Sequence, residues 1–138
     1  MKRSFVIIVV TLVVGIMVGF AVDRLLNAQG EPIRRTSLLQ TELQGVPGKV
    51  ADLFLIEMAP ATATGRHSHP GNEIAYILEG TASIEAAGNS TITQARGSVS
   101  HLAPNLVHEV KNLSKTEPMK AIVFALYDKG KPTTTPAK

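Results

Sequence analysis

The sequence predicts an all-β domain, either a sandwich or a closed barrel, preceded by one apolar N-terminal helix. Two observations predict the domain. No helical periodicity appears after residue 45, and short alternating or apolar runs each end at a turn residue, about every ten residues. A third observation predicts the helix, because residues 5–22 form an unbroken apolar stretch.

The apolar stretch is long enough to cross a membrane. It runs from Phe5 to Val22, with Thr11 as its one polar residue, and it follows the basic pair Lys2 and Arg3. As a helix it would reach about 27 Å, close to the thickness of a bilayer's hydrocarbon core. The basic pair favours a cytoplasmic N-terminus, which would place the domain outside the cytoplasm, in the periplasm or the extracellular space. The sequence leaves open an uncleaved signal anchor, which the length favours, and a signal peptide whose cleavage would release a secreted domain.

These patterns divide the chain into four segments. Residues 1–30 are a signal anchor or signal peptide with its tether, 31–44 are a linker, 45–128 are the barrel, and 129–138 are a disordered tail. The tail sequence GKPTTTPAK lacks the apolar content needed to pack against a core. Seven strands are expected within the barrel, over residues 49–58, 73–79, 81–86, 91–94, 98–103, 107–111 and 120–128.

Composition excludes several classes of function. The chain has no cysteine, which rules out a thiol nucleophile, a disulfide framework and a cysteine zinc site. Its formal net charge of +3 lies mostly in the N-terminal segment, so the domain itself is nearly neutral. The domain has no basic stripe interleaved with aromatic residues, and nucleic acid is therefore not expected as a partner. The sequence leaves open whether the chain is a monomer or a homodimer.

Two of the four histidines are spaced for metal binding. His67 and His69 are two residues apart, so in an extended segment their side chains point to the same face. Glu73 follows at the start of the next expected strand and could add a carboxylate oxygen. A third imidazole must come from elsewhere in the chain, and His108 is the candidate. Three nitrogens and one oxygen would leave coordination positions open for water or substrate, as in a catalytic rather than a structural site.

The spacing around these histidines resembles the first motif of the cupin superfamily, G(x)5HxH(x)3-4E(x)6G. His67, His69, Glu73 and Gly80 all stand at the family spacing. The leading glycine of the motif falls on Ala61.

A second stretch resembles the second cupin motif, G(x)5PxG(x)2H(x)3N. Gly97, His108 and Asn112 keep the family spacing. The proline is shifted by one position to Pro104, and Asn105 replaces the second glycine. Asparagine is the non-glycine residue that best tolerates a left-handed backbone, so we expect the turn to be kept.

The resemblance covers residues 45–128 and implies a small single-domain cupin, with the double-stranded β-helix or jelly-roll barrel of that superfamily. It implies one divalent transition metal, which in this family is Fe, Mn, Ni, Cu or Zn. It also implies the metal ligands, which carry over onto His67, His69, Glu73 and His108.

Other polar residues receive structural assignments. His101 has no fixed phase relative to the metal ligands, and we interpret it as a structural or exposed histidine. Tyr76, three residues after Glu73, falls on the opposite face of its strand. Asn112 is interpreted as a turn residue at a strand end. No catalytic residue beyond the ligands is identified.

Two classes of function follow. The first is an enzyme acting on a small organic molecule, foremost an oxidoreductase of dioxygenase type, or an isomerase, lyase or decarboxylase if the metal is redox-inert. The second is a module that binds or senses a small molecule or a metal without turnover. Intact ligands favour the enzyme, and a barrel with a vestigial site is the least favoured interpretation.

Overall fold

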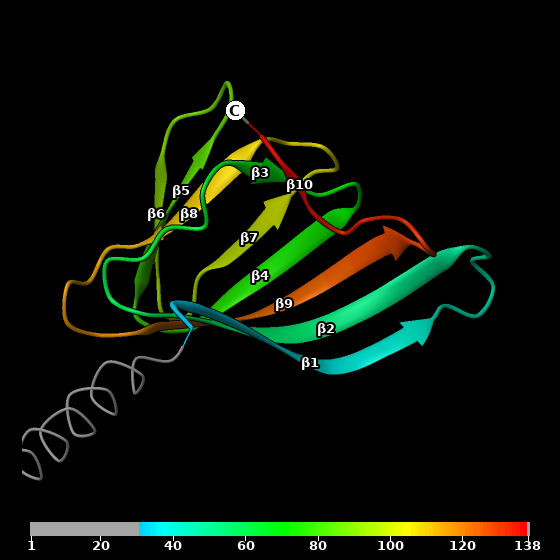
Figure 1. Cartoon of the computed structure of the whole chain (residues 1–138), viewed down its shortest axis with the longest axis horizontal. Helices are drawn as coiled ribbons and strands as arrows, with labels where there is room; N and C mark the ends of the chain where they lie inside the picture. Colours follow the sequence, from blue (N-terminus) through cyan, green and yellow to red (C-terminus); the bar gives the residue numbers. More distant parts are fainter. Residues whose placement is uncertain (1–30, 138) are drawn as a thin grey trace, which may run out of the picture. The chain divides into compact units, whose positions relative to one another are not determined.

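Strands joined by turns make up the part of the chain that the computed structural model describes, residues 31–137 (Figure 1). The N-terminal helix expected over residues 1–30 lies outside these described residues. Between residues 31 and 137 no helix is long and apolar enough to span a membrane. The prediction of an all-β domain is confirmed.

Ten strands form two five-stranded sheets, and every strand pair is antiparallel. The first sheet has the order β1-β2-β9-β4-β7, with bounds β1 Ile33–Glu42, β2 Lys49–Met58, β9 Met119–Asp128, β4 Asn72–Glu79 and β7 Val99–Leu102. The second has the order β10-β3-β8-β5-β6, with bounds β10 Thr135–Pro136, β3 His67–Ser68, β8 His108–Asn112, β5 Thr81–Ala86 and β6 Ile92–Ala95. In Figure 1 the last long strand, β9, lies between β2 and β4.

Strand β9 shows why this sequence folds as a half-buried sheet. Its residues alternate strictly, and the inward side chains from Met119 to Tyr127 are buried at every second position. Met119 packs with Met58 and Ile77 in one apolar cluster, while Val123 packs with Phe54 in a second. Burial of these aliphatic and aromatic side chains is the main favourable term in folding.

The linker expected over residues 31–44 is wrong, because β1 occupies most of it. This strand pairs with β2 along nearly its whole length, with a bulge between Ser37 and Leu39. It is almost entirely exposed, so it lacks the apolar alternation that identifies a strand from sequence. Two ion pairs connect it to β2 instead. Arg34 pairs with Glu57, and Arg35 pairs with Asp52.

The disordered tail expected over residues 129–138 is also corrected, within the part that is described. Thr135 and Pro136 form β10, which pairs with β3 at Ser68 and His67. The backbone N–H of Ala137 then donates to the carbonyl of Arg66 at 2.9 Å. The segment binds through its backbone, which explains why its polar composition did not predict the contact.

The two residues that replace a glycine of the cupin motifs both have a left-handed backbone. Ala61 has φ of 55° and Asn105 has φ of 62°. The expectation for Asn105 is confirmed, since the turn keeps the conformation that the missing glycine would adopt. Ala61 adopts it as well, although a Cβ makes that conformation costly.

Candidate metal centre

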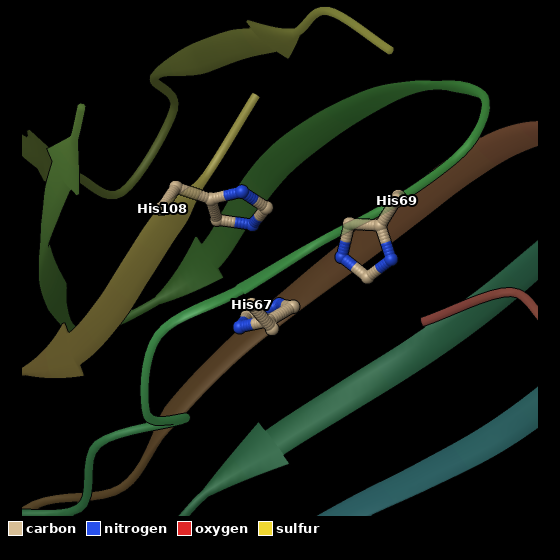
Figure 2. Close-up of side chains that lie close together, drawn as sticks. All are labelled: His67, His69 and His108. Carbon is tan, nitrogen blue, oxygen red and sulfur yellow. The ribbon is translucent and has the colours of Figure 1, made fainter. Parts of the chain in front are cut away.

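Strand pairing brings three histidines together. His67 on β3 stands directly opposite His108 on β8, so their side chains share a face of the sheet. His69 follows two residues after His67 and points the same way. One ligand atom from each of the three lies within 4.8 Å of the others. Figure 2 shows the three rings arranged around a common space, two from the segment of β3 and one from β8.

The hydrogen bonds of the three rings decide which nitrogen is free. Each Nδ1 faces a backbone carbonyl: Gly65 for His67 at 2.8 Å, Thr133 for His69 at 2.7 Å and Leu106 for His108 at 2.9 Å. Because a carbonyl only accepts, each Nδ1 carries the proton and donates it. In their neutral form the rings would therefore present three Nε2 lone pairs, which is the tautomer that binds metal.

The carboxylate of Glu73 lies beside this group. One of its oxygens, Oε1, accepts the hydrogen bond of the Tyr127 hydroxyl, and the other, Oε2, lies 3.3 Å from Nε2 of His69. In the tautomer described above Nε2 of His69 is an acceptor, and an ionised carboxylate oxygen also accepts. A cation between these two atoms would therefore be favourable, so the donor set fits a metal ion.

Burial shifts two pKa values in the site. Burial, opposed by the hydrogen bond to Leu106 and reinforced by the charges of His67 and His69, lowers the pKa of His108 to about 4. Burial and then the adjacent Glu73 raise the pKa of Tyr127 well above its usual value. Near neutral pH the His108 ring is therefore neutral, and the Tyr127 hydroxyl keeps its proton and donates it.

Loops on either side of the site hold the segment of His69 and Glu73 in place. The N–H of Asn105, in its left-handed turn, donates to the carbonyl of His69 at 2.6 Å. Gly71, between His69 and Glu73, packs so closely on β9 that an added Cβ would lie 1.8 Å from the carbonyl oxygen of Leu126. Only glycine fits at this position without moving the strand.

Two groups of the site were not predicted from the sequence. Tyr127 is the last inward residue of β9 and is 3% exposed, and its hydroxyl contacts Glu73 from a strand far along the chain. Thr133 supplies the carbonyl that orients His69, from a tail that was expected to be disordered. The strict alternation of β9 could have marked Tyr127 as inward-facing, whereas nothing in the tail marks Thr133.

Three other expectations concern residues outside the ligand group. His101 on β7 bonds through Nε2 to the side-chain oxygen of Asn72 at 2.8 Å and is not among the three grouped histidines. Tyr76 is exposed on the face of β4 opposite to Glu73. Asn112 is buried, and its amide nitrogen lies within hydrogen-bond distance of the carbonyls of Met58, Ala59 and Glu117.

A cavity of about 210 Å³ opens beside the three histidines and extends into the core. Glu73 and Tyr127 line it together with the aliphatic side chains that face inward from both sheets. Four of the groups that meet there, the three histidines and Glu73, come from the stretch that carries the two sequence motifs.

A family model described as "Cupin domain" matches residues 54–125 of the chain, a span that contains all three histidines and Glu73. The chain belongs to the cupin family. No curated protein sequence matches this cupin with statistical significance.

Solved structures share the fold at low sequence identity. The cupin 2 domain-containing protein from Halorhodospira halophila is 16% identical, with a TM-score of 0.63, over 80% of this chain and 75% of that one. The protein with a double-stranded β-helix domain from Klebsiella pneumoniae subsp. pneumoniae MGH 78578 is 19% identical, with a TM-score of 0.61, over 80% and 87%. DMSP lyase DddQ from Ruegeria pomeroyi DSS-3 is 17% identical, with a TM-score of 0.62, over 77% of this chain and 52% of its own. This cupin thus spans about half the length of that lyase.

Proposed function

We propose that this cupin is a metal-dependent enzyme that acts on a small organic molecule. His67, His69 and His108 would bind the metal through Nε2, and Glu73 would complete the set as an oxygen ligand. One observation carries the proposal. Three backbone carbonyls fix the three Nδ1 protons, so that three Nε2 lone pairs and an adjacent carboxylate face one space.

The donor set agrees with a divalent transition metal. Neutral imidazoles with one carboxylate suit Fe, Mn, Ni, Cu and Zn alike, so availability and geometry choose among them. When bound, such a metal supplies a Lewis acid and, if it is Fe, Mn, Ni or Cu, a redox centre. The protein's own groups position what binds there. Tyr127 holds one oxygen of Glu73 and leaves the other directed at His69.

Among the possible reactions, the residues that line the cavity favour an oxidation of dioxygenase type. Of the described residues that line the cavity, only Arg35 and Tyr127 are titratable side chains outside the proposed ligand set. Arg35 is paired with Asp52, and the Tyr127 hydroxyl donates to Glu73. Chemistry that depends on the metal more than on a separate acid and base agrees with this lining. A dioxygenase also places both oxygen atoms in its product, and so it needs no separate reductant.

The second candidate is a lyase, and a specific observation favours it. Structures of DMSP lyases are among those that share the fold, and in a lyase the Tyr127 hydroxyl, which donates to Glu73 in this structure, would turn from that carboxylate to protonate a leaving group or carbanion. A module that binds a small molecule without turnover is the remaining alternative.

Metal analysis combined with oxygen dependence tests these functions. Protein purified without a chelator or a histidine tag should contain close to one divalent metal per chain. With small carboxylic acids as substrates, a dioxygenase consumes one O₂ per product molecule and is inactive without oxygen. A lyase is equally active in air and under nitrogen. A chain that holds no metal after incubation with each of the five ions contradicts the proposal.

We also propose that the domain lies outside the cytoplasm, anchored through residues 5–22 or secreted after cleavage. The basic pair Lys2 and Arg3 before the apolar stretch supports this orientation. A reporter enzyme that is active only outside the cytoplasm should be active when it is fused after residue 138. Activity of a reporter that works solely inside would contradict the proposal.

A further inference from the structure

The cavity beside the histidines is small and mostly apolar. Its volume is about 210 Å³. An apolar protein cavity of about 150 Å³ admits benzene, so this one suits a molecule of roughly eight or nine non-hydrogen atoms. Beyond the ligands its walls are mainly aliphatic, and they include Ile77, Ala82, Ile84, Leu102, Val110 and Met119.

The walls offer no free charge to a ligand. Within the described part of the chain, the guanidinium of Arg35 and the carboxylate of Glu73 are the groups of these two kinds that line the cavity. Nη2 of Arg35 lies 2.5 Å from Asp52, and its guanidinium stacks 3.8 Å from the ring centre of Phe54. Glu73 is engaged by Tyr127 and directed at His69. A second charged group on a ligand would therefore be buried without a partner, which is strongly unfavourable.

One neutral polar group in the wall lacks a partner. Among the described residues that line the cavity, only Ser100 has a buried side-chain polar atom, its hydroxyl, without a hydrogen bond. Ser100 is 7% exposed and stands opposite Ala75, while Leu102 on the same strand stands opposite Glu73. Ser100 is two residues from Leu102 along β7. It therefore lies roughly 7 Å along the strand from the position opposite Glu73, beside the proposed metal site. Buried hydroxyls are normally hydrogen-bonded, so Ser100 keeps a hydrogen-bonding capacity that no described residue satisfies.

We propose that the cavity binds a small monocarboxylate with an uncharged, mostly aliphatic body and one neutral hydrogen-bonding group. The carboxylate would meet the metal, the body would lie against the aliphatic walls, and the neutral group would reach the hydroxyl of Ser100. This inference rests on the proposed metal site. It excludes dicarboxylates, phosphorylated molecules, and carboxylates that carry a cation at the far end.

Four commercially available acids of matched size test the ligand class on the full chain loaded with Zn²⁺. Hexanoate and 5-aminopentanoate differ by a terminal cation, and 5-oxohexanoate and glutarate differ by a second carboxylate. Calorimetry should show 5-oxohexanoate binding most tightly, about three- to tenfold more tightly than hexanoate. Glutarate and 5-aminopentanoate should bind at least tenfold more weakly than their uncharged counterparts.

A serine substitution locates the neutral contact. Ser100→Ala should remove the preference for 5-oxohexanoate, so that this acid and hexanoate bind with similar affinity. Ser98→Ala is the matched control, because Ser98 precedes β7 and does not line the cavity, and it should keep the preference.

Zinc content, measured in the same samples, separates the two proposals. Two outcomes at one zinc per chain would overturn the ligand class alone. In the first, glutarate or 5-aminopentanoate binds as tightly as its uncharged counterpart, and in the second no acid binds. A preference that survives Ser100→Ala overturns the assignment of Ser100. Absence of bound zinc overturns the metal site and, with it, the proposed position of the carboxylate.

Discussion

Glu73 and Tyr127 stand on long strands in the middle of a sheet, whereas His67 and His69 come from a strand of two residues and the turn after it. Strand β9, which carries Tyr127, pairs with β2 on one side and β4 on the other over many positions. Strand β3 pairs with β8 at the single position of His67 and His108, and with β10 at two positions. The carboxylate side of the site is therefore built into the core, as is His108 through the pairing of β8 with β5, whereas the segment of His67 and His69 is held by a few local contacts.

This difference indicates which side a metal would stabilise. Short strands with few hydrogen bonds open locally at a lower free energy than central strands. A metal bound by ligands from both sides would connect the weakly paired segment to the core sheet, and its binding free energy would then add to the stability of that segment. Disruption of the imidazole side should accordingly affect metal affinity more than disruption of the contacts around Glu73.

Removal of an imidazole should have the largest effect. His67→Ala or His108→Ala deletes one of three nitrogen ligands, and metal affinity should fall by more than about 100-fold, as measured by competition with a chromophoric chelator. His101→Ala is the matched control and should leave the affinity unchanged, because His101 bonds to Asn72. Loss of binding in the control with retention in His108→Ala would refute the ligand assignment.

Deletion of residues 131–138 should have the next largest effect. It removes β10 and the Thr133 carbonyl that accepts the Nδ1 proton of His69. Loss of such an orienting partner typically lowers metal affinity about 10- to 100-fold. The far-UV spectrum should remain that of a β protein. Thr133→Ala should bind metal normally because it keeps the carbonyl. Undiminished affinity in the truncated chain would mean that the tail does not orient His69.

On the core side, Tyr127→Phe should have a smaller effect. The change removes the hydroxyl that donates to Glu73 but keeps the ring in the core, and Glu73 retains its place on β4. A hydrogen bond to a charged group contributes about 1.5–3 kcal/mol. Because β4 still positions Glu73, only the lower end of that range should be lost from metal binding, which is a roughly tenfold fall in affinity. Tyr76→Phe, on the exposed face of β4, should change nothing. An effect as large as that of His108→Ala would contradict the contrast between the two sides.

How much of this site the sequence could predict depends on how local each contact is. His67 and His69 follow from alternation alone, because both lie in one extended segment. His108 required the register of a family motif, since spacing within the chain does not show that it pairs opposite His67. Tyr127 contacts Glu73 across 54 residues and Thr133 contacts His69 across 64. Those contacts depend on strand pairing that no local pattern encodes.

The same distinction applies to the fold. The apolar alternation of β9 follows from burial on one face, and its span was predicted almost to the residue. Strand β1 buries almost nothing and is fixed by pairing with β2 and by the ion pairs of Arg34 and Arg35, so its polar sequence matched a linker. Strands stabilised mainly by backbone pairing leave little mark in the pattern of side chains.

The stability of the metal-free protein should fall as pH decreases. The folded pKa of His108 is about 4, below the ordinary pKa of 6.5 for a histidine in an unfolded chain. Between these values the unfolded chain binds a proton that the folded chain does not, so the contribution is complete above about pH 6.5 and is lost as pH falls toward 4. The slope should approach about 1.4 kcal/mol per pH unit. Urea midpoints measured in a chelator should show a slope that His108→Gln reduces and His101→Gln preserves. Equal slopes in wild type and His108→Gln would refute the burial effect.

The smallest expected effect concerns Ala61, which lies outside both sides of the site and carries the strain left by a missing glycine. At φ of 55° its Cβ crowds the backbone at a cost of about 1–2 kcal/mol, while glycine adds about 0.5–1 kcal/mol of unfolded-chain entropy. Ala61→Gly should therefore raise the free energy of unfolding by roughly 0.5–1 kcal/mol and increase Tm by a few degrees. Ala103→Gly, at a position without a positive φ, should lower Tm instead. Because Ala61 is exposed and its N–H bonds to the carbonyl of Ser114, metal affinity should not change in either variant. A lower Tm for Ala61→Gly would show that the left-handed turn is not strained.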